Sequence, residues 1–375
     1  MMKKLMLPCA IKGFKIENYQ GIIKTNIADL PGETQWIFLT GENGFGKTSV
    51  LQAIAIGLFG NQDNKRILTE NDCQITIEFN NHGNNQINRL GTPQFQAFTQ
   101  FVAYGSSRLE IQNQQTRNEV SEKSTTTYGL FNTDGVLLNI EYEFFIGYLK
   151  KHPKFSVIKK TLLKLLPYIA DIQVNEKDEV VYIEKENGGN NQTYEPIPFR
   201  KLASGHKSII AMIGDMLIRF YQQQPEVIEP QDFCGIVLID ELELHLHPKW
   251  QRQLPSLLSA VFPKVQFIAS THSVIPFLGA PENSVFLKVK RSKEQGIKIE
   301  QINIDIINLL PNILLTSPLF DLDIKPENNR SLSLLRTEET YDEAKLNDEI
   351  RASLKAFEES EDDFPDDLFI TNDQR

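Results

Sequence analysis

Cysteine is scarce in this sequence, which has only Cys9, Cys73 and Cys234 among its 375 residues. The three are widely separated and odd in number, so the sequence predicts neither a disulfide framework nor a zinc site built on cysteine. Such sparse use of cysteine is typical of a protein in a reducing compartment, and we expect a cytoplasmic location.

Long apolar runs are also lacking. The apolar stretch that follows Lys3 and Lys4 ends at Lys12, and no later run approaches the roughly 18 apolar residues that a membrane span requires. The sequence therefore predicts a soluble protein without a signal peptide or a membrane interaction. The 155 residues between Thr48 and Ser204 also lack the sustained heptads of long coiled-coil arms.

An excess of positive charge is missing, since the net charge is −10. Residues 356–375 contribute −7 of this, so the rest of the chain carries only −3, and we expect this acidic tail to be disordered. One stretch, residues 150–170, is rich in lysine and free of acids. It is either the solvated face of a helix or a surface for a phosphate backbone or an acidic partner. Its lysines are Lys150, Lys151, Lys154, Lys159, Lys160 and Lys164.

The segment GENGFGKT, residues 41–48, has the phosphate-loop pattern G-x-x-x-x-G-K-[ST]. Its context fits, because WIFL before it is predicted to be a buried strand and SVLQAIAIGLF after it a helix that ends at Gly60. Glycines make room there for backbone N–H groups to surround phosphates at a helix N-terminus. The predicted nucleotide-binding residues are Gly41, Glu42, Asn43, Gly44, Phe45, Gly46, Lys47, Thr48 and Ser49.

Two side chains of this loop have predicted roles in ATP chemistry. Lys47 would reach the β- and γ-phosphates as a point charge, and the Thr48 hydroxyl would be a magnesium ligand. ATP and Mg²⁺ are therefore the expected cofactors.

A second motif follows the apolar run GIVLI, which is typical of a strand buried on both faces of a parallel sheet. The run ends in Asp240 and Glu241. A phosphate-loop enzyme needs one carboxylate to hold magnesium and another to orient or deprotonate the attacking water. We predict the first role for Asp240 and the second for Glu241.

The histidines after this pair do not indicate zinc. His245 and His247 have no third histidine or cysteine at ligand spacing. Pro248 is predicted to be the first residue of a helix, which places His247 at the helix cap.

Two further segments belong with these motifs. Ser204 and Gly205, in KLASGH, precede an amphipathic pattern and are predicted to open a second helix N-terminus that suits an anion. The segment STHS follows the predicted buried strand VQFIA, at the strand end where open α/β sheets bind ligands. Within this set of motifs we interpret His272 as a γ-phosphate sensor rather than a residue of an ordinary loop.

The segments GENGFGKT, LASGHKS, VLIDELELHLHP and IASTHS, in that order, resemble the ABC-type ATPase heads of the SMC and RecF-like superfamily. The ELHLHP segment makes the OLD-type branch the most similar, and IKGFKIENYQGI resembles the first strand of such heads. The resemblance covers about residues 10–285. It implies an α/β fold with a mixed or parallel sheet, a helical insert and a helical C-terminal extension.

In that family two heads sandwich ATP. The resemblance implies that Ser204 and Gly205 contact the γ-phosphate held by the other head, that Glu241 is the general base and that His272 is the switch histidine. It also implies that residues 243–247 lie at the dimer seam.

The sequence departs from the family in its signature and its glutamine. His206 and Lys207 stand where the family has a second glycine and a glutamine. The magnesium-binding glutamine is not placed; Gln94, Gln100 and Gln112 are candidates, and the segment FVAYGSSR is its expected neighbourhood.

The segments between and after these motifs have patterns of their own. Residues 111–136 are polar and predicted to be a mobile loop, residues 137–169 one or two helices, and residues 178–199 a hairpin with its turn at 187–190. The apolar segment near residues 309–322 is either a docking element or packs on the head. We therefore expect five regions: an ATPase lobe (1–110), a polar loop and helical insert (111–175), the rest of the ATPase core (176–300), a helical extension (301–355) and the acidic tail (356–375).

The resulting hypothesis is an ATPase that dimerises around ATP and controls a separate effector protein. The OLD-like resemblance suggests antiviral defence in a prokaryote, and the roughly 90 residues after the last motif are too few for a nuclease domain. Two alternatives stay open: a repair or chromosome ATPase that binds nucleic acid directly, and a nucleotide-gated scaffold with little turnover.

Overall fold

The computed structural model describes residues 6–60, 72–112, 121–185, 193–304, 306, 309, 311–320, 350 and 352. The chain divides into a unit of residues 1–322 and a unit of residues 323–375. The architecture below is that of the first unit. The acidic tail and most of the predicted helical extension lie outside the described residues.

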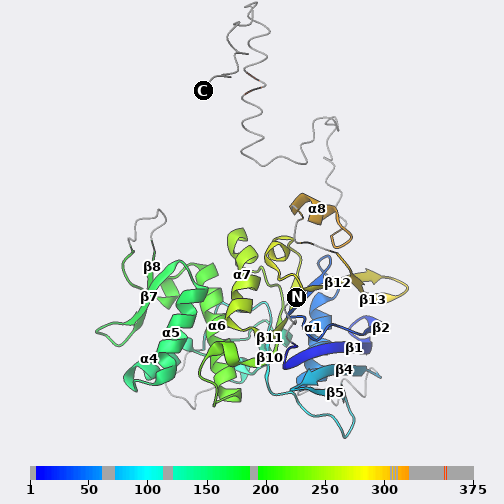
Figure 1. Ribbon diagram of the computed structural model, residues 1–375, viewed down its shortest axis with the longest axis horizontal. Helices are drawn as coiled ribbons and strands as arrows, with labels where there is room; N and C mark the ends of the chain where they lie inside the picture. Colours follow the sequence, from blue (N-terminus) through cyan, green and yellow to red (C-terminus); the bar gives the residue numbers. More distant parts are fainter. Residues whose placement is uncertain are drawn as a thin grey trace, which may run out of the picture. The chain divides into compact units, whose positions relative to one another are not determined.

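A sheet of six described strands forms the centre of this unit (Figure 1). Its strands are β3 (Trp36–Thr40), β6 (Phe101–Tyr104), β10 (Cys234–Ile239), β11 (Lys264–Thr271), β12 (Val285–Ser292) and β13 (Gly296–Ile302). The order is β13-β12-β3-β11-β10-β6, and every neighbouring pair is parallel except β12 and β13. The carboxyl ends of β3, β10 and β11 therefore meet at one edge, which is where such sheets bind ligands.

Both faces of the sheet are buried, because alternate residues of each strand point to opposite sides. Trp36 and Phe38 belong to a cluster that includes α6 (Ser204–Gln223) and α7 (Pro248–Val261). Ile37 and Leu39 belong to a second cluster, which includes α1 (Lys47–Phe59). The continuous apolar runs of β3 and β10 thus confirm the prediction of strands buried on both faces.

A second, antiparallel sheet packs on the α1 side and is drawn in blue and cyan in Figure 1. Its order is β2-β1-β4-β5, and β1 is the first strand that the resemblance implies. The bounds are β1 (Cys9–Tyr19), β2 (Ile22–Ile27), β4 (Gln74–Asn81) and β5 (Asn84–Arg89).

Helix α1 lies in the cluster that joins the two sheets, and it ends as predicted at Gly60, whose φ is 88°. It is buried on more than one side, because Val50, Ala53 and Ile56 are as fully buried as Leu51 and Ile54. A helix covered by a sheet on either side is apolar all round.

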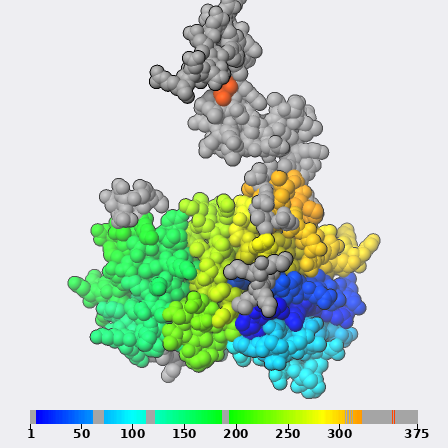
Figure 2. All heavy atoms as spheres, viewed as in Figure 1, coloured from blue at the N-terminus to red at the C-terminus, as the bar shows by residue number. Residues whose placement is uncertain are grey.

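The helical insert predicted within residues 137–169 is confirmed as two helices. It is drawn in green, away from the antiparallel sheet (Figures 1 and 2). The predicted hairpin is present as the antiparallel pair β8 and β9, joined by β7, and its turn lies outside the described residues. The bounds are α4 (Ile140–Leu149), α5 (Pro153–Leu165), β7 (Ile169–Val174), β8 (Val180–Glu184) and β9 (Ile197–Pro198).

Parts of the polar loop and of the apolar segment near residues 309–322 pack on the head, which is one of the two alternatives for the second segment. In the described part of the polar loop, α3 (Tyr128–Phe131) buries Leu130, and the Arg219 guanidinium donates to the Ser124 carbonyl at 2.6 Å. Near the other end, α8 (Pro311–Thr316) and the residues after it bury Leu314 and Leu319 completely. These residues therefore pack on the head, whereas a docking element would leave them uncovered.

Among the helices of the described residues, none combines the length and the apolar character needed to cross a bilayer.

Candidate functional site

The phosphate loop connects β3 to α1, and two of its glycines leave no room for a side chain. A Cβ on Gly46 would come within 2.3 Å of Ile297 Cδ1, and one on Gly41 would come within 2.4 Å of the Val289 carbonyl oxygen. Gly46 also has a φ of 94°, in the left-handed region that favours glycine. The loop is therefore held against β12 and β13, with the N-terminus of α1 open to an anion.

Lys47 lies folded over this loop. Its Nζ donates hydrogen bonds to the carbonyl oxygens of Gly41 at 2.7 Å and Glu42 at 3.0 Å. Burial lowers the pKa of the Lys47 ammonium, and three nearby carboxylates oppose that shift. The ammonium group is thus held at the phosphate loop by two backbone carbonyl oxygens.

The two predicted magnesium ligands lie side by side. Thr48 Oγ1 donates to Asp240 Oδ2 at 2.8 Å, across 192 residues of sequence. The other oxygen of Asp240 accepts from Ser270 Oγ at 2.5 Å. This Thr48–Asp240–Ser270 chain joins the ends of β3, β10 and β11, as expected from the sheet order.

Glu241 follows Asp240 in a left-handed conformation, with a φ of 49°. Its backbone N–H donates to Ser270 Oγ at 2.8 Å. Its carboxylate is partly exposed and makes no hydrogen bond among the described residues. A carboxylate that is held by its backbone but unpartnered at its oxygens is available to accept a proton from water.

Arg108 supports this pair and was not identified from the sequence. Its guanidinium is buried and donates to the carbonyl oxygens of Asp240 at 2.7 Å and Glu241 at 2.6 Å. Burial lowers the pKa of Arg108 to about 10, although the nearby acids oppose the shift. The available signal was its position just after the strand segment FVAY, but its partners are backbone atoms, which no side-chain pattern reveals.

Glu243 was also missed as a partner of His272. It is buried, and its Oε1 accepts from the His272 backbone N–H at 2.8 Å and lies 2.7 Å from His272 Nδ1. The His272 side chain is 48% exposed, so Glu243 orients the ring from its Nδ1 side while the rest of the ring is accessible.

The signature pair lies at the exposed N-terminus of α6, as predicted. A pocket of about 470 Å³ is lined by Gly205, His206 and the post-glutamate residues His245 and His247. A Cβ on Gly205 would be 3.0 Å from the His245 carbonyl oxygen. Among the described residues, no hydrogen bond joins Ser204 or Gly205 to the phosphate loop of the same chain.

His206, which departs from the family pattern, pairs with Glu184 at 2.6 Å and stacks on Tyr168. The residue therefore ties the signature helix to β8. At the other side of the pocket His247 accepts from the Lys249 backbone N–H at 3.3 Å, which confirms the predicted cap of α7.

The glutamine candidates do not complete the site. The Gln100 carbonyl accepts from Ile236 N–H, at the end of β10 opposite Asp240. Gln112 Oε1 accepts from Ser124 Oγ and the Ser121 N–H. Gln94 lies in the chain just before Phe98, which bonds to the C-terminal end of α1.

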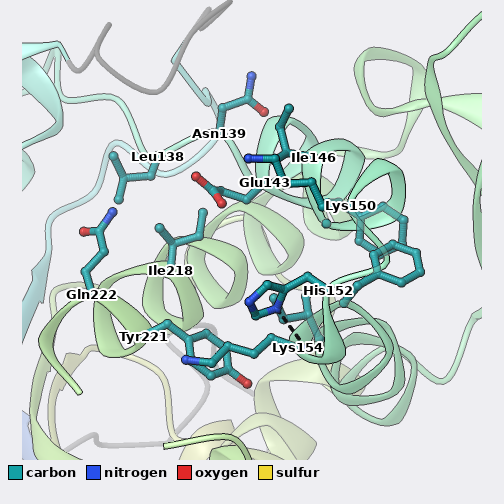
Figure 3. A pocket seen from close by; sticks show the side chains of 14 residues that line it. Leu138, Asn139, Glu143, Ile146, Lys150, His152, Lys154, Ile218, Tyr221 and Gln222 are labelled. Carbon is teal, nitrogen blue, oxygen red and sulfur yellow. Dashed lines mark hydrogen bonds between the residues drawn. The ribbon is translucent and has the colours of Figure 1, made fainter. Parts of the chain in front are cut away.

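The lysine-rich stretch borders a pocket of about 380 Å³ between α4, α5 and α6 (Figure 3). Lys154 is turned inward there: its Nζ donates to the Pro225 carbonyl at 2.8 Å and lies 4.3 Å from the Tyr221 ring centre. Lys159 forms an ion pair with Asp171 at 2.6 Å. These two lysines thus have partners within the chain, while the other four are exposed.

The phosphate loop, the strand ending in Asp-Glu, the signature-type helix and the histidine after the next strand are together the arrangement expected of a P-loop nucleotide-binding head. The comparisons agree with this class. Residues 14–195 match the family described as "AAA domain", and residues 159–277 match "AAA domain, putative AbiEii toxin, Type IV TA system".

Curated relatives are similar over different parts of the chain. Septu protein PtuA of Bacillus mycoides (strain KBAB4) is 26% identical over 311 residues, which is 76% of this chain and 41% of that protein. The Retron Vc95 probable ATPase of Vibrio cholerae is 34% identical over 118 residues, 32% of this chain and 22% of that protein. The chain therefore spans less than half the length of these relatives. The chain is thus similar to a Septu protein and to a retron probable ATPase, and the predicted α/β fold with a mixed sheet is confirmed.

Among solved structures, the SMC head domain from Thermotoga maritima is 12% identical, with a TM-score of 0.42 over 78% of this chain and 99% of that one. The Smc head bound to the C-terminal domain of ScpA, derived from Pyrococcus furiosus, is 12% identical, with a TM-score of 0.47 over 79% of this chain and 96% of that one.

Proposed function

We propose that this chain binds ATP with Mg²⁺ at its phosphate loop and hydrolyses it with Glu241 as the general base. The observation that carries the proposal is the Thr48–Asp240–Ser270 chain. Thr48 Oγ1 and Asp240 Oδ2 are hard oxygen donors 2.8 Å apart, a set that suits Mg²⁺.

Each residue has a defined part in this reaction. Lys47 exchanges its two loop carbonyls for the β- and γ-phosphates, and the N-terminus of α1 adds favourable partial charge. Mg²⁺ held by Thr48 and Asp240 would neutralise developing charge on the phosphate oxygens. Glu241 accepts the proton of the attacking water, and the open face of His272 meets the γ-phosphate.

The second part of the proposal is a head-to-head dimer around ATP. It is supported by the exposed N-terminus of α6 and by the pocket that Gly205 shares with the post-glutamate segment. In the dimer, Ser204 and Gly205 of one chain would complete the site of the other.

The third part is control of a separate effector protein in antiphage defence. It is supported by similarity to a Septu protein and to retron ATPases. We favour an acidic protein over DNA as partner of the lysine-rich stretch, because residues 1–355 carry a net charge of −3 and the stretch contains no arginine. Lys154 and Lys159 are engaged within the chain. This leaves Lys150, Lys151, Lys160 and Lys164 available for a partner.

The experiment is ATP turnover together with sedimentation velocity. Glu241→Gln should bind ATP, lose turnover and form dimers only with ATP and Mg²⁺. Adding Ser204→Arg should restore the monomer, because a long side chain would fill the γ-phosphate seat of the partner. Adding Ser256→Arg, at an exposed serine of α7, is the matched control and should leave the dimer intact.

The other outcomes are distinct. Lys47→Ala should reduce ATP affinity by more than about 100-fold, whereas the exposed control Lys177→Ala should not. Normal hydrolysis by Glu241→Gln would refute the assignment of the base. ATP binding with negligible turnover in the native protein would favour the scaffold alternative.

A further inference from the structure

Two of the three cysteines meet at the end of the sheet opposite the phosphate loop. Cys9 is the first residue of β1 and Cys234 the first residue of β10, and both are buried. Because these residues lie far apart along the chain, their spacing shows no zinc motif. In the structure, the ligand atoms of Cys9, His82 and Cys234 all lie within 4.8 Å of one another.

The Gln100 amide oxygen lies beside these three ligand atoms and is a fourth candidate. His82 Nε2 is 3.8 Å from Cys9 Sγ and 3.8 Å from Cys234 Sγ. Gln100 Oε1 is 3.3 Å from Cys9 Sγ, 3.9 Å from Cys234 Sγ and 3.0 Å from His82 Nε2. The set therefore consists of two thiols, one imidazole nitrogen and one amide oxygen.

These separations fit a tetrahedral zinc site. With Zn–S of about 2.3 Å and Zn–N or Zn–O of about 2.0–2.2 Å, ideal geometry places sulfur about 3.6 Å from nitrogen or oxygen and nitrogen about 3.4 Å from oxygen. The observed 3.3–3.9 Å and 3.0 Å differ from these values by a few tenths of an ångström.

The surrounding backbone holds the ligands in place. His82 and Gly83 form the turn between β4 and β5, both with positive φ, and the His82 N–H donates to the Pro8 carbonyl at 2.7 Å. The Gln100 carbonyl accepts from Ile236 N–H at 3.0 Å. Gln224 Nε2 donates to the Cys234 carbonyl at 2.9 Å. Such outer contacts are what fixes the first ligands of a metal site.

We propose that Cys9, His82, Cys234 and Gln100 bind one zinc ion. Soft thiolates with an imidazole favour zinc over magnesium or calcium. The exposed His82 gives the ion a route from solvent. The ion would join the antiparallel sheet, through β1 and the β4–β5 turn, to the amino ends of β6 and β10. This is a structural site, because Asp240 and Glu241 lie at the other end of β10.

The test uses the full chain expressed with added zinc and measures its metal content after gel filtration. We expect about one zinc per chain in the native protein and in Cys73→Ser, which changes the one cysteine outside the cluster. Cys234→Ser and His82→Gln should hold less than about a tenth of that amount. His82→Gln is the informative variant, because an exposed side chain can change without disturbing the core.

Two further readouts separate the alternatives. Co²⁺ added to the metal-free protein should give thiolate charge-transfer absorption, and this should be absent in His82→Gln. Zinc removal should lower the Tm of the native protein by roughly 5 °C, whereas His82→Gln, already without zinc, should not respond. A native protein that is metal-poor and silent with Co²⁺ would overturn the proposal. Zinc retained by both Cys234→Ser and His82→Gln would also overturn it, as would a thiol count showing a Cys9–Cys234 disulfide.

Discussion

Glu243 holds His272 by two atoms at once, since one carboxylate oxygen lies 2.8 Å from the backbone nitrogen and 2.7 Å from Nδ1 of the histidine. The backbone contact fixes the segment and the ring contact fixes the imidazole. The atom left to meet a ligand is Nε2.

Glu243→Gln should therefore reduce kcat for ATP about tenfold while changing KM for ATP less than about twofold. The amide keeps one acceptor oxygen but cannot hold both donors with a negative charge, so the ring loses its orientation. Steady-state kinetics will show this, with Glu176→Gln at an exposed site as control. Native kcat in Glu243→Gln, beside a large loss in His272→Ala, would mean that the contact does not position the ring.

Arg108→Met should lower the free energy of unfolding by about 2–4 kcal/mol, because two strand-end carbonyls lose their buried donor. It should also slow turnover at least tenfold, since those carbonyls belong to Asp240 and Glu241. Denaturant unfolding and ATPase assays measure the two effects. Arg252→Met, at an exposed arginine, should change neither; unchanged turnover in a destabilised Arg108→Met would confine Arg108 to folding.

A pH-dependent contribution to stability is expected from Glu141, in the first turn of α4. Burial, with a smaller contribution from Glu179, raises the pKa of Glu141 from 4.5 to about 7. The folded chain then binds the proton more tightly than the unfolded chain, so stability is lost as pH rises from about 4.5 to about 7. Glu141→Gln removes this loss.

The difference in Tm between Glu141→Gln and the native protein should accordingly increase between pH 5 and pH 8, in favour of the variant. Thermal unfolding at several pH values tests this, with Glu176→Gln as the exposed control. A difference that stays constant with pH would show that Glu141 titrates normally.

The partner of the lysine-rich stretch can be tested by salt. We expect negligible DNA affinity at physiological salt, and unchanged ATP turnover when Lys150, Lys151, Lys160 and Lys164 are replaced by glutamine. If these lysines instead contact phosphates, affinity will fall steeply with salt, with a log–log slope of about −0.9 per contact, and the variant will flatten that slope. DNA binding by Glu241→Gln with ATP across a salt series distinguishes the two; salt-sensitive binding lost in the variant would contradict our preference.

Much of this architecture could be predicted because local patterns specify it. Trp36 and Phe38 are buried on one face of the sheet and Ile37 on the other, as expected for an apolar run long enough for one strand. Gly46 indicates the turn before α1, and Pro248 indicates the start of α7. The meeting of Thr48 with Asp240 follows from parallel strands that share an edge.

The parts that could not be predicted depend on contacts without a sequence signature. Arg108 binds backbone carbonyls, so no residue type marks its partners. His82 reaches Cys9 across 73 residues and Cys234 across 152 residues, far from the short spacing of most zinc motifs. For Leu314 and Leu319 the sequence left docking and packing open, because nothing local shows that the head covers them.

The contacts of Arg108 also bear on how the acids beside it can change. A buried cation paired with carboxylates would lose its charged partners if those carboxylates were neutralised. Arg108 instead donates to the backbone carbonyl oxygens of residues 240 and 241, which are present whatever the side chains are. The carboxylates can therefore be exchanged for amides one at a time while the scaffold beneath them stays paired, so a chemical defect can be separated from a folding defect at this position.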